Sequence, residues 1–211
     1  MPAIELNVPF TLVTCDGCGQ ARPAGARCPS CGSTTIFDDP SVDRRRRIVG
    51  RVRPLLHEPT GIRTQIAPTD VFGALGQWAD PFLHACAQVM DDTEDEAVGR
   101  MGLSARTLRE IEDRVAATPH AKGDPAAWST IDGVLAALRG VIDEYFAALT
   151  AADPAVCQEH GAAAQRSLDA AGQIAATLGA RLTRQSDEES GFWRGLFVGA
   201  LGGWLFGRHR P

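Results

Sequence analysis

The chain has 211 residues, of which 44% are hydrophobic, and it carries 26 acidic against 21 basic residues. This length allows one domain with a small additional module, and the hydrophobic content is sufficient for a packed core. The net charge is +3 over residues 1–67, −11 over residues 68–190 and +3 over residues 191–211. The acidic centre is therefore a poor nucleic-acid surface, whereas either basic end could meet phosphates or anionic lipid headgroups.

The first ten residues, MPAIELNVPF, lack the basic start, apolar run and cleavage site of a secretory signal. We therefore expect the chain to begin in the cytoplasm, where thiols stay reduced. Cysteine pairs in such a protein are expected to bind metal rather than to form disulfides.

Four of the six cysteines form two CxxC pairs, each followed by glycine: Cys15, Cys18, Cys28 and Cys31. Two such knuckles complete a tetrahedral four-sulfur site with no open position. The motifs CDGCG and CPSCG resemble those of short zinc ribbons, and the resemblance covers residues 10–37. It implies a structural Zn²⁺ on these cysteines, with strands over 10–14 and 33–37. Iron or an iron–sulfur centre would use the same ligands.

Six arginines follow the ribbon within ten residues: Arg44, Arg45, Arg46, Arg47, Arg51 and Arg53. They predict a patch for an anionic partner, either nucleic acid or lipid headgroups, and a solvated basic linker is the alternative. Residues 48–54 alternate enough for an edge strand. No aromatic residue lies between Phe37 and Phe72, so a base-stacking platform is absent from this stretch.

An acidic helical bundle is predicted after this linker. Asp-Pro pairs at Asp80, Asp124 and Asp153 each indicate a helix start, because Asp caps the first turn and Pro needs no amide partner there. The clearest helix spans 125–149, with large side chains three and four residues apart: Trp128, Ile131, Leu135, Leu138, Ile142, Tyr145 and Leu149. A helix over 154–184 is expected to pair with it as an antiparallel hairpin. Shorter helices over 70–78, 81–90, 94–101 and 105–116 complete the bundle.

Residues 97–111 also look like a helix-turn-helix, with Gly102 at the turn. The surrounding acidic residues would repel a DNA backbone, and two bundle helices that meet at a glycine explain the same pattern.

Two cysteines could serve as nucleophiles, Cys86 beside His84 and Cys157 beside His160. A lone cysteine on an apolar helix face is more often a small core residue. The chain has no phosphate loop, dinucleotide fingerprint or HExxH motif, so we expect no enzyme and no catalytic residues.

The C-terminal segment is apolar and has glycines four residues apart: Gly191, Gly195, Gly199, Gly203 and Gly207. On a helix they share one face, with Trp193 and Trp204 among the large residues between them. The pattern resembles a glycine zipper, which implies close packing with a second copy or membrane contact. The thirteen uncharged residues 195–207 give about 20 Å of helix, short of a hydrocarbon core of about 30 Å. The tail could therefore span a thinned bilayer, lie at its interface or pack on protein.

The sequence thus predicts a mainly α protein divided into a zinc ribbon (1–40), an Arg-rich linker (41–68), an acidic α-helical bundle (69–186) and a glycine-zipper tail (187–211). We expect a non-enzymatic scaffold that binds a protein partner or itself and reaches lipid through its tail. A membrane-acting effector is the sharper form of this expectation. It would be cytoplasmic, peripheral to or inserted in the inner face of a membrane. The alternative is a nucleic-acid-binding regulator that uses the ribbon and residues 44–53.

Overall fold

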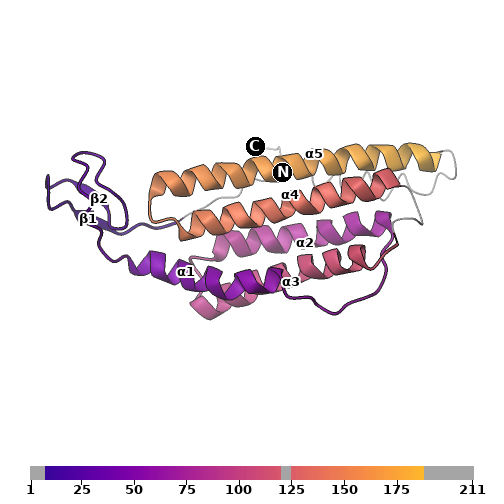
Figure 1. The fold of residues 1–211 in the computed structure, drawn as a ribbon, viewed down its shortest axis with the longest axis horizontal. Coiled ribbons are helices and arrows are strands. Elements are labelled where there is room, and N and C mark those ends of the chain that lie inside the picture. The colour runs from indigo at the N-terminus through magenta and orange to yellow at the C-terminus, as the bar shows by residue number, and fades with distance from the viewer. Residues whose placement is uncertain (1–7, 120–124, 188–211) are drawn as a thin grey trace, which may run out of the picture.

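A computed structural model describes residues 8–119 and 125–187, and the side chains of the last helix as far as Leu178. The elements in chain order are β1 Leu12–Thr14, β2 Ala21–Pro23, α1 Pro40–Val52, the 3-10 helix η1 Arg53–Leu56, α2 Pro68–Gln88, α3 Glu94–Ala116, α4 Pro125–Thr150 and α5 Pro154–Asp187. The helices form an elongated bundle with the small antiparallel sheet at one end (Figure 1). The predicted mainly α fold with a small β module at its N-terminal side is confirmed.

Helices α1, α3 and α5 run away from the sheet, whereas α2 and α4 run towards it (Figure 1). The C-terminal ends of α2 and α4 therefore lie at the end of the bundle where α1 begins. Helix α5 packs lengthwise on α4, and α1 packs on α3 and α4. The predicted antiparallel hairpin of two long helices is present as α4 and α5, and all seven predicted seam residues of α4 are buried.

Aromatic side chains fill the centre of the bundle. The rings of Trp78 and Phe82 are stacked with centroids 4.8 Å apart, and Tyr145 meets Phe82 edge-on at 6.2 Å. The buried polar groups of these residues have partners, because the Trp78 indole donates to the Ser104 carbonyl at 2.8 Å and the Tyr145 hydroxyl to the Cys86 carbonyl at 2.8 Å. These two contacts satisfy the polar side-chain atoms of Trp78 and Tyr145 within the protein.

Two predicted helix boundaries are wrong. Helix α2 continues through Pro81 instead of restarting there, since the flanking Ala79 and Phe82 are both buried while Pro81 faces solvent. Burial of this face outweighs the one backbone hydrogen bond that proline removes. Helix α3 is likewise unbroken from Glu94 to Ala116, so no helix-turn-helix forms at Gly102. A Cβ at Gly102 would lie 3.0 Å from the Leu55 side chain, so this glycine allows close approach of η1 rather than a turn.

The Arg-rich segment forms helix α1, not the predicted edge strand or linker. Asp39 caps the helix by accepting from the Ser41 amide at 2.9 Å, and Pro40 occupies the first turn. This is the same Asp-Pro start signal that the sequence shows three more times further on. Ile48 and Val52 are buried in the core of the bundle, so α1 belongs to the bundle. In residues 48–54 the few hydrophobic residues stand among arginines, so their positions match the alternating pattern of a strand as well as one face of a helix.

Candidate metal centre

Each cysteine pair lies in a tight turn with the same backbone hydrogen bonds. The Gly19 amide donates to the Cys15 carbonyl at 2.8 Å, and the Gly32 amide to the Cys28 carbonyl at 2.9 Å. Both glycines have positive φ, +71° and +73°, which a residue with a Cβ adopts only with strain. The strands predicted on either side form only in part: β1 precedes the first knuckle, but the second strand, β2, lies between the knuckles rather than over 33–37.

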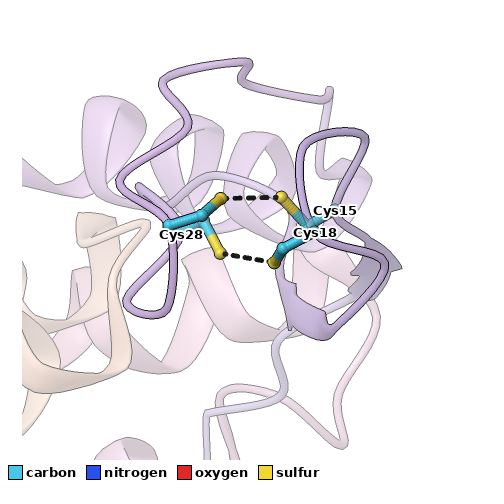
Figure 2. A group of neighbouring side chains, drawn as sticks. Cys15, Cys18 and Cys28 are labelled. Carbon is cyan, nitrogen blue, oxygen red and sulfur yellow. Dashed lines mark hydrogen bonds between the residues drawn. The ribbon is translucent and has the colours of Figure 1, made fainter.

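The four sulfur atoms gather in one place, all within 4.8 Å of one another. The Sγ atoms of Cys15 and Cys31 are 3.6 Å apart and those of Cys18 and Cys28 are 3.7 Å apart (Figure 2). A tetrahedral ion with metal–sulfur bonds of about 2.3 Å separates its ligands by about 3.8 Å. The cysteines therefore fit one tetrahedral metal ion with little movement. Among the residues that the structure describes, no other His, Cys, Asp or Glu cluster offers a metal site.

The thiols of the cluster differ in their tendency to ionise. Burial raises the pKa of Cys15, but hydrogen bonds from the Gly17 and Cys18 amides and from neighbouring thiols outweigh it and hold the pKa at about 6. The Ser33 amide lowers the pKa of Cys31, but its contacts with the other thiols raise it to about 12. A metal ion must displace these retained protons, so metal affinity is expected to fall as the pH is lowered.

Side chains outside the knuckles fix their relative position. The carboxylate of Asp16, inside the first knuckle, accepts from the hydroxyls of Ser33 at 3.1 Å and Thr35 at 2.8 Å, just beyond the second. The buried guanidinium of Arg22 on β2 donates to the carbonyls of Ala26 and Thr35. These contacts preorganise the sulfur cluster and were not predicted from the sequence, because nothing in the spacing marks Asp16 or Arg22.

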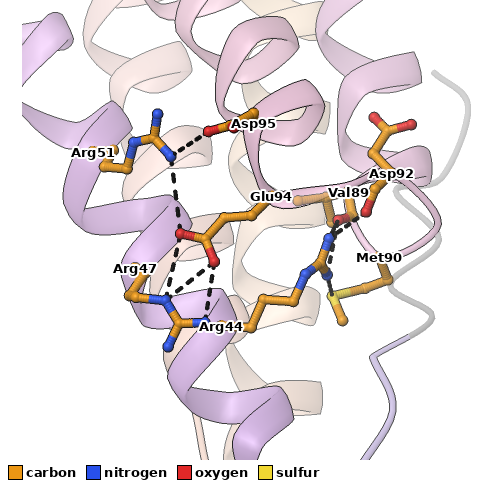
Figure 3. A network of polar contacts seen from close by, with 8 residues as sticks. All are labelled: Arg44, Arg47, Arg51, Val89, Met90, Asp92, Glu94 and Asp95. Atoms are coloured by element: carbon orange, nitrogen blue, oxygen red, sulfur yellow. Dashed lines mark hydrogen bonds and ion pairs between the residues drawn. The ribbon is translucent and has the colours of Figure 1, made fainter.

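The first two arginines of the run cap the ends of other helices. Arg44 donates to the Val89 carbonyl at 3.4 Å and to the Asp92 carbonyl, beyond the end of α2 (Figure 3). Arg45 is fully buried and donates to the Leu149 carbonyl at 2.7 Å, at the end of α4. Carbonyls at a helix C-terminus have no helical partner and carry partial negative charge, which a guanidinium satisfies.

The other four arginines also have partners within the chain. Arg47 pairs with Glu94 at 3.1 Å and Arg51 with Asp95 at 2.8 Å, both between α1 and α3 (Figure 3). Arg46 meets Asp43 at 3.7 Å, and the Arg53 guanidinium lies 5.7 Å from the centre of the Phe146 ring. Three of the six arginines predicted to attract an anionic partner, Arg46, Arg47 and Arg51, therefore have a carboxylate partner within the chain.

The two candidate nucleophiles are packed into the protein. Cys86 is 3% exposed and Cys157 is 5% exposed, and burial raises the pKa of both thiols. His84 is exposed on the surface of α2, and His160 pairs through Nδ1 with Glu144 at 2.7 Å. Neither cysteine thus has the accessible, acidified thiol that nucleophilic catalysis needs.

The glycine register and both tail tryptophans, residues 191–207, lie outside the described residues. Within 8–119 and 125–187, no helix has the length and apolar character needed to cross a bilayer. Comparisons of the chain with protein-family models, with curated proteins and with solved structures gave no match.

Proposed function

We propose that this protein is a non-enzymatic scaffold in which a zinc-bound ribbon closes one end of a helical bundle, and the C-terminal segment provides membrane association and self-assembly. The observation that carries the non-enzymatic part is the closed character of the cysteine site. Four protein sulfurs complete the coordination of one ion, so no position is open for a substrate or an activated water.

Zinc is the ion that we propose for this site. Four thiolates at tetrahedral spacing suit Zn²⁺, and a ribbon of about thirty residues has too small a core to fold without its ion. Iron is the competing ion, because thiolates alone do not select the metal. Metal analysis of the purified protein, together with its absorption spectrum, distinguishes colourless zinc from coloured iron.

The layout of the bundle supports separate roles for its two ends. The ribbon lies at one end of the bundle, and α5 runs from that end to the opposite one, where its last described residue is Asp187 (Figure 1). Residues 188–211 include the glycines spaced four apart. After Gly191 this segment has three basic residues and no acidic residue. An apolar segment with basic flanks is suited to anionic lipid, and its glycine face to a second copy.

Liposome flotation tests the membrane part of the proposal. We expect the zinc-loaded full chain to float with vesicles that contain anionic lipid, and a chain that ends at Ser190 to remain at the bottom. If both chains stay at the bottom and both sediment as monomers, the proposal is wrong.

The glycine face can be tested within the full chain. Replacing Gly199 and Gly203 by leucine adds bulk to that face, and we expect the oligomer on the vesicles to be lost while flotation remains. Ala200→Leu is the matched control, because it adds a similar side chain outside the four-residue register. Equal loss of oligomer in both variants would contradict a role of the glycine face in self-assembly.

The nucleic-acid alternative has less support, since the six arginines from Arg44 to Arg53 contact the chain's own acceptors and rings. Binding to DNA or RNA that weakens steeply with salt, and that disappears when Arg46 and Arg47 become alanine, would favour this alternative.

A further inference from the structure

The ribbon is docked on the turn between α4 and α5, where it covers a small buried cluster. The cluster contains Ala148, Ala151 and Cys157, and Val8 and Phe10 from the start of the ribbon pack against it. These two residues lie within four positions before the start of β1 at Leu12, and β1 leads into the first cysteine knuckle. The apolar cover of the turn is thus supplied by the metal-binding module.

Buried polar groups tie the same junction together. Arg45 donates to the Pro9 carbonyl of the ribbon at 2.6 Å and to the Ala151 carbonyl of the turn at 3.1 Å, and its guanidinium lies 5.1 Å from the centre of the Phe10 ring. Asp39 accepts from the Thr11 amide at 3.1 Å and hydroxyl at 2.9 Å while it caps α1. One arginine and one aspartate therefore connect the ribbon, α1 and the α4–α5 turn.

The segment between the two knuckles makes the closest approach. Ala24 and Ala26 are buried, and a Cβ placed on Gly25 would lie 2.6 Å from the Cβ of Ala152 in the α4–α5 turn. This close fit requires glycine at position 25. Because Cys18 and Cys28 flank this segment in the sequence, a shared metal ion restricts its conformations.

We infer that the ribbon is a metal-dependent latch on the α4–α5 turn, so that metal binding by the four cysteines and closure of this end of the bundle are coupled. The inference rests on the proposed metal site. Loss of the ion frees the ribbon to unfold locally and withdraws Val8 and Phe10 from the turn, whereas the core between α2, α3 and α4 keeps its own contacts.

The two non-ligand cysteines report on these two regions separately. Cys157 lies under the ribbon, where burial raises the pKa of its thiol and the charge of Arg45 offsets only part of this increase. Cys86 lies in the aromatic core, where its carbonyl accepts from Tyr145. Opening of the latch exposes Cys157 and leaves Cys86 protected.

Thiol alkylation of the full chain, resolved by peptide mass spectrometry, tests the latch. The protein is labelled with N-ethylmaleimide as the zinc-loaded form, after chelation, and after zinc is restored. We expect chelation to raise the labelling rate of Cys157 by about tenfold or more, with zinc reversing the effect and Cys86 remaining unlabelled. Equal protection of Cys157 in both states would overturn the latch, and so would parallel labelling of Cys86, which indicates global unfolding.

A variant that keeps all four ligands provides a second test. Gly25→Ala is expected to open the latch with zinc still bound, because its methyl group would overlap Ala152. Gly50→Ala on α1 is the control, since a Cβ there meets no atom within 4 Å. Faster labelling of Cys157 in Gly25→Ala alone supports the latch, and unchanged labelling contradicts it. Metal content, measured on the same samples, separates the proposals: a protein without metal refutes the site and the latch, whereas a metal-loaded protein with unchanged Cys157 refutes only the latch.

Discussion

Replacement of Arg45 by alanine tests the structural role of the arginine run most sharply. Its guanidinium is fully buried and donates to three carbonyls: Leu149 at 2.7 Å, Ala151 at 3.1 Å and Pro9 at 2.6 Å. Alanine would leave all three acceptors without this donor and would open a space under the Phe10 ring. The variant therefore weakens the end of α4 and the ribbon junction together.

The expected cost follows from the number of acceptors. A buried polar group that loses its partner costs about 1–3 kcal/mol. The Pro9 carbonyl keeps the Ser41 hydroxyl at 3.2 Å, so the two buried acceptors, on Leu149 and Ala151, give a range of about 2–6 kcal/mol. Water that enters the space left by the side chain provides some of the missing hydrogen bonds to these carbonyls. We therefore expect the free energy of unfolding to fall by about 3–5 kcal/mol. Domains of this kind have a total stability of about 5–15 kcal/mol, so the variant is expected to fold but to unfold at much lower denaturant.

Urea unfolding of the zinc-loaded protein, followed by far-ultraviolet circular dichroism, measures this loss. The neighbouring variant Arg46→Ala is the matched control, because the Arg46 side chain is 57% exposed and its contact with Asp43 is 3.7 Å long. We expect it to change stability by less than about 0.5 kcal/mol. Equal effects of the two substitutions, or a loss below about 1 kcal/mol for Arg45→Ala, would refute the reasoning.

Three further predictions concern single contacts. Burial raises the pKa of Asp39 above its ordinary 3.8, but hydrogen bonds to its carboxylate outweigh this and hold the pKa at about 2. The ionised Asp39 carboxylate therefore contributes its full stabilisation above pH 3.8 and loses it as the pH falls through about 2. The difference in free energy of unfolding between the native protein and Asp39→Asn should accordingly shrink on acidification by on the order of 2 kcal/mol. A difference that does not change with pH would contradict this. Gly19→Ala should lower the melting temperature, because alanine at φ +71° costs about 1–2 kcal/mol. Gly50→Ala should raise stability by about 0.5–1 kcal/mol, because Gly50 lies within a helix and its Cβ would meet no atom. The reverse order of stabilities would show that backbone conformation does not set the effect of these two substitutions. Thr93→Ala should cost about 1 kcal/mol in urea unfolding, because Thr93 and Glu96 form a capping box at the start of α3, and an unchanged midpoint would count against that cap.

Features with a strong local signal could be predicted from the sequence. The CxxCG spacing identified four cysteines that the fold brings within 4.8 Å, because two short turns position all four sulfurs. The seam from Trp128 to Leu149 predicted a buried helix face, and the short joint before Pro154 predicted its antiparallel partner. In each case the residues that determine the feature lie close together in the sequence.

Features that depend on tertiary contacts could not be predicted in this way. The partners of Arg44 and Arg45 are at least 36 residues away in sequence, so the arginine run resembles a free basic patch when only the sequence is considered. Pro81 and Gly102 are ordinary helix breakers, yet packing of the bundle keeps both inside continuous helices. The Asp39-Pro40 pair carried a local signal that the sequence analysis did not use, since it marks the start of α1.

Native mass spectrometry of the full chain beside a chain that ends at Ser190 tests the central claim most directly. The proposed scaffold predicts one zinc ion per chain in both proteins, because Cys15 to Cys31 are common to them, and oligomers of the full chain alone. A full chain that carries no metal, or that has the same oligomeric state as the shortened one in detergent, would contradict the account.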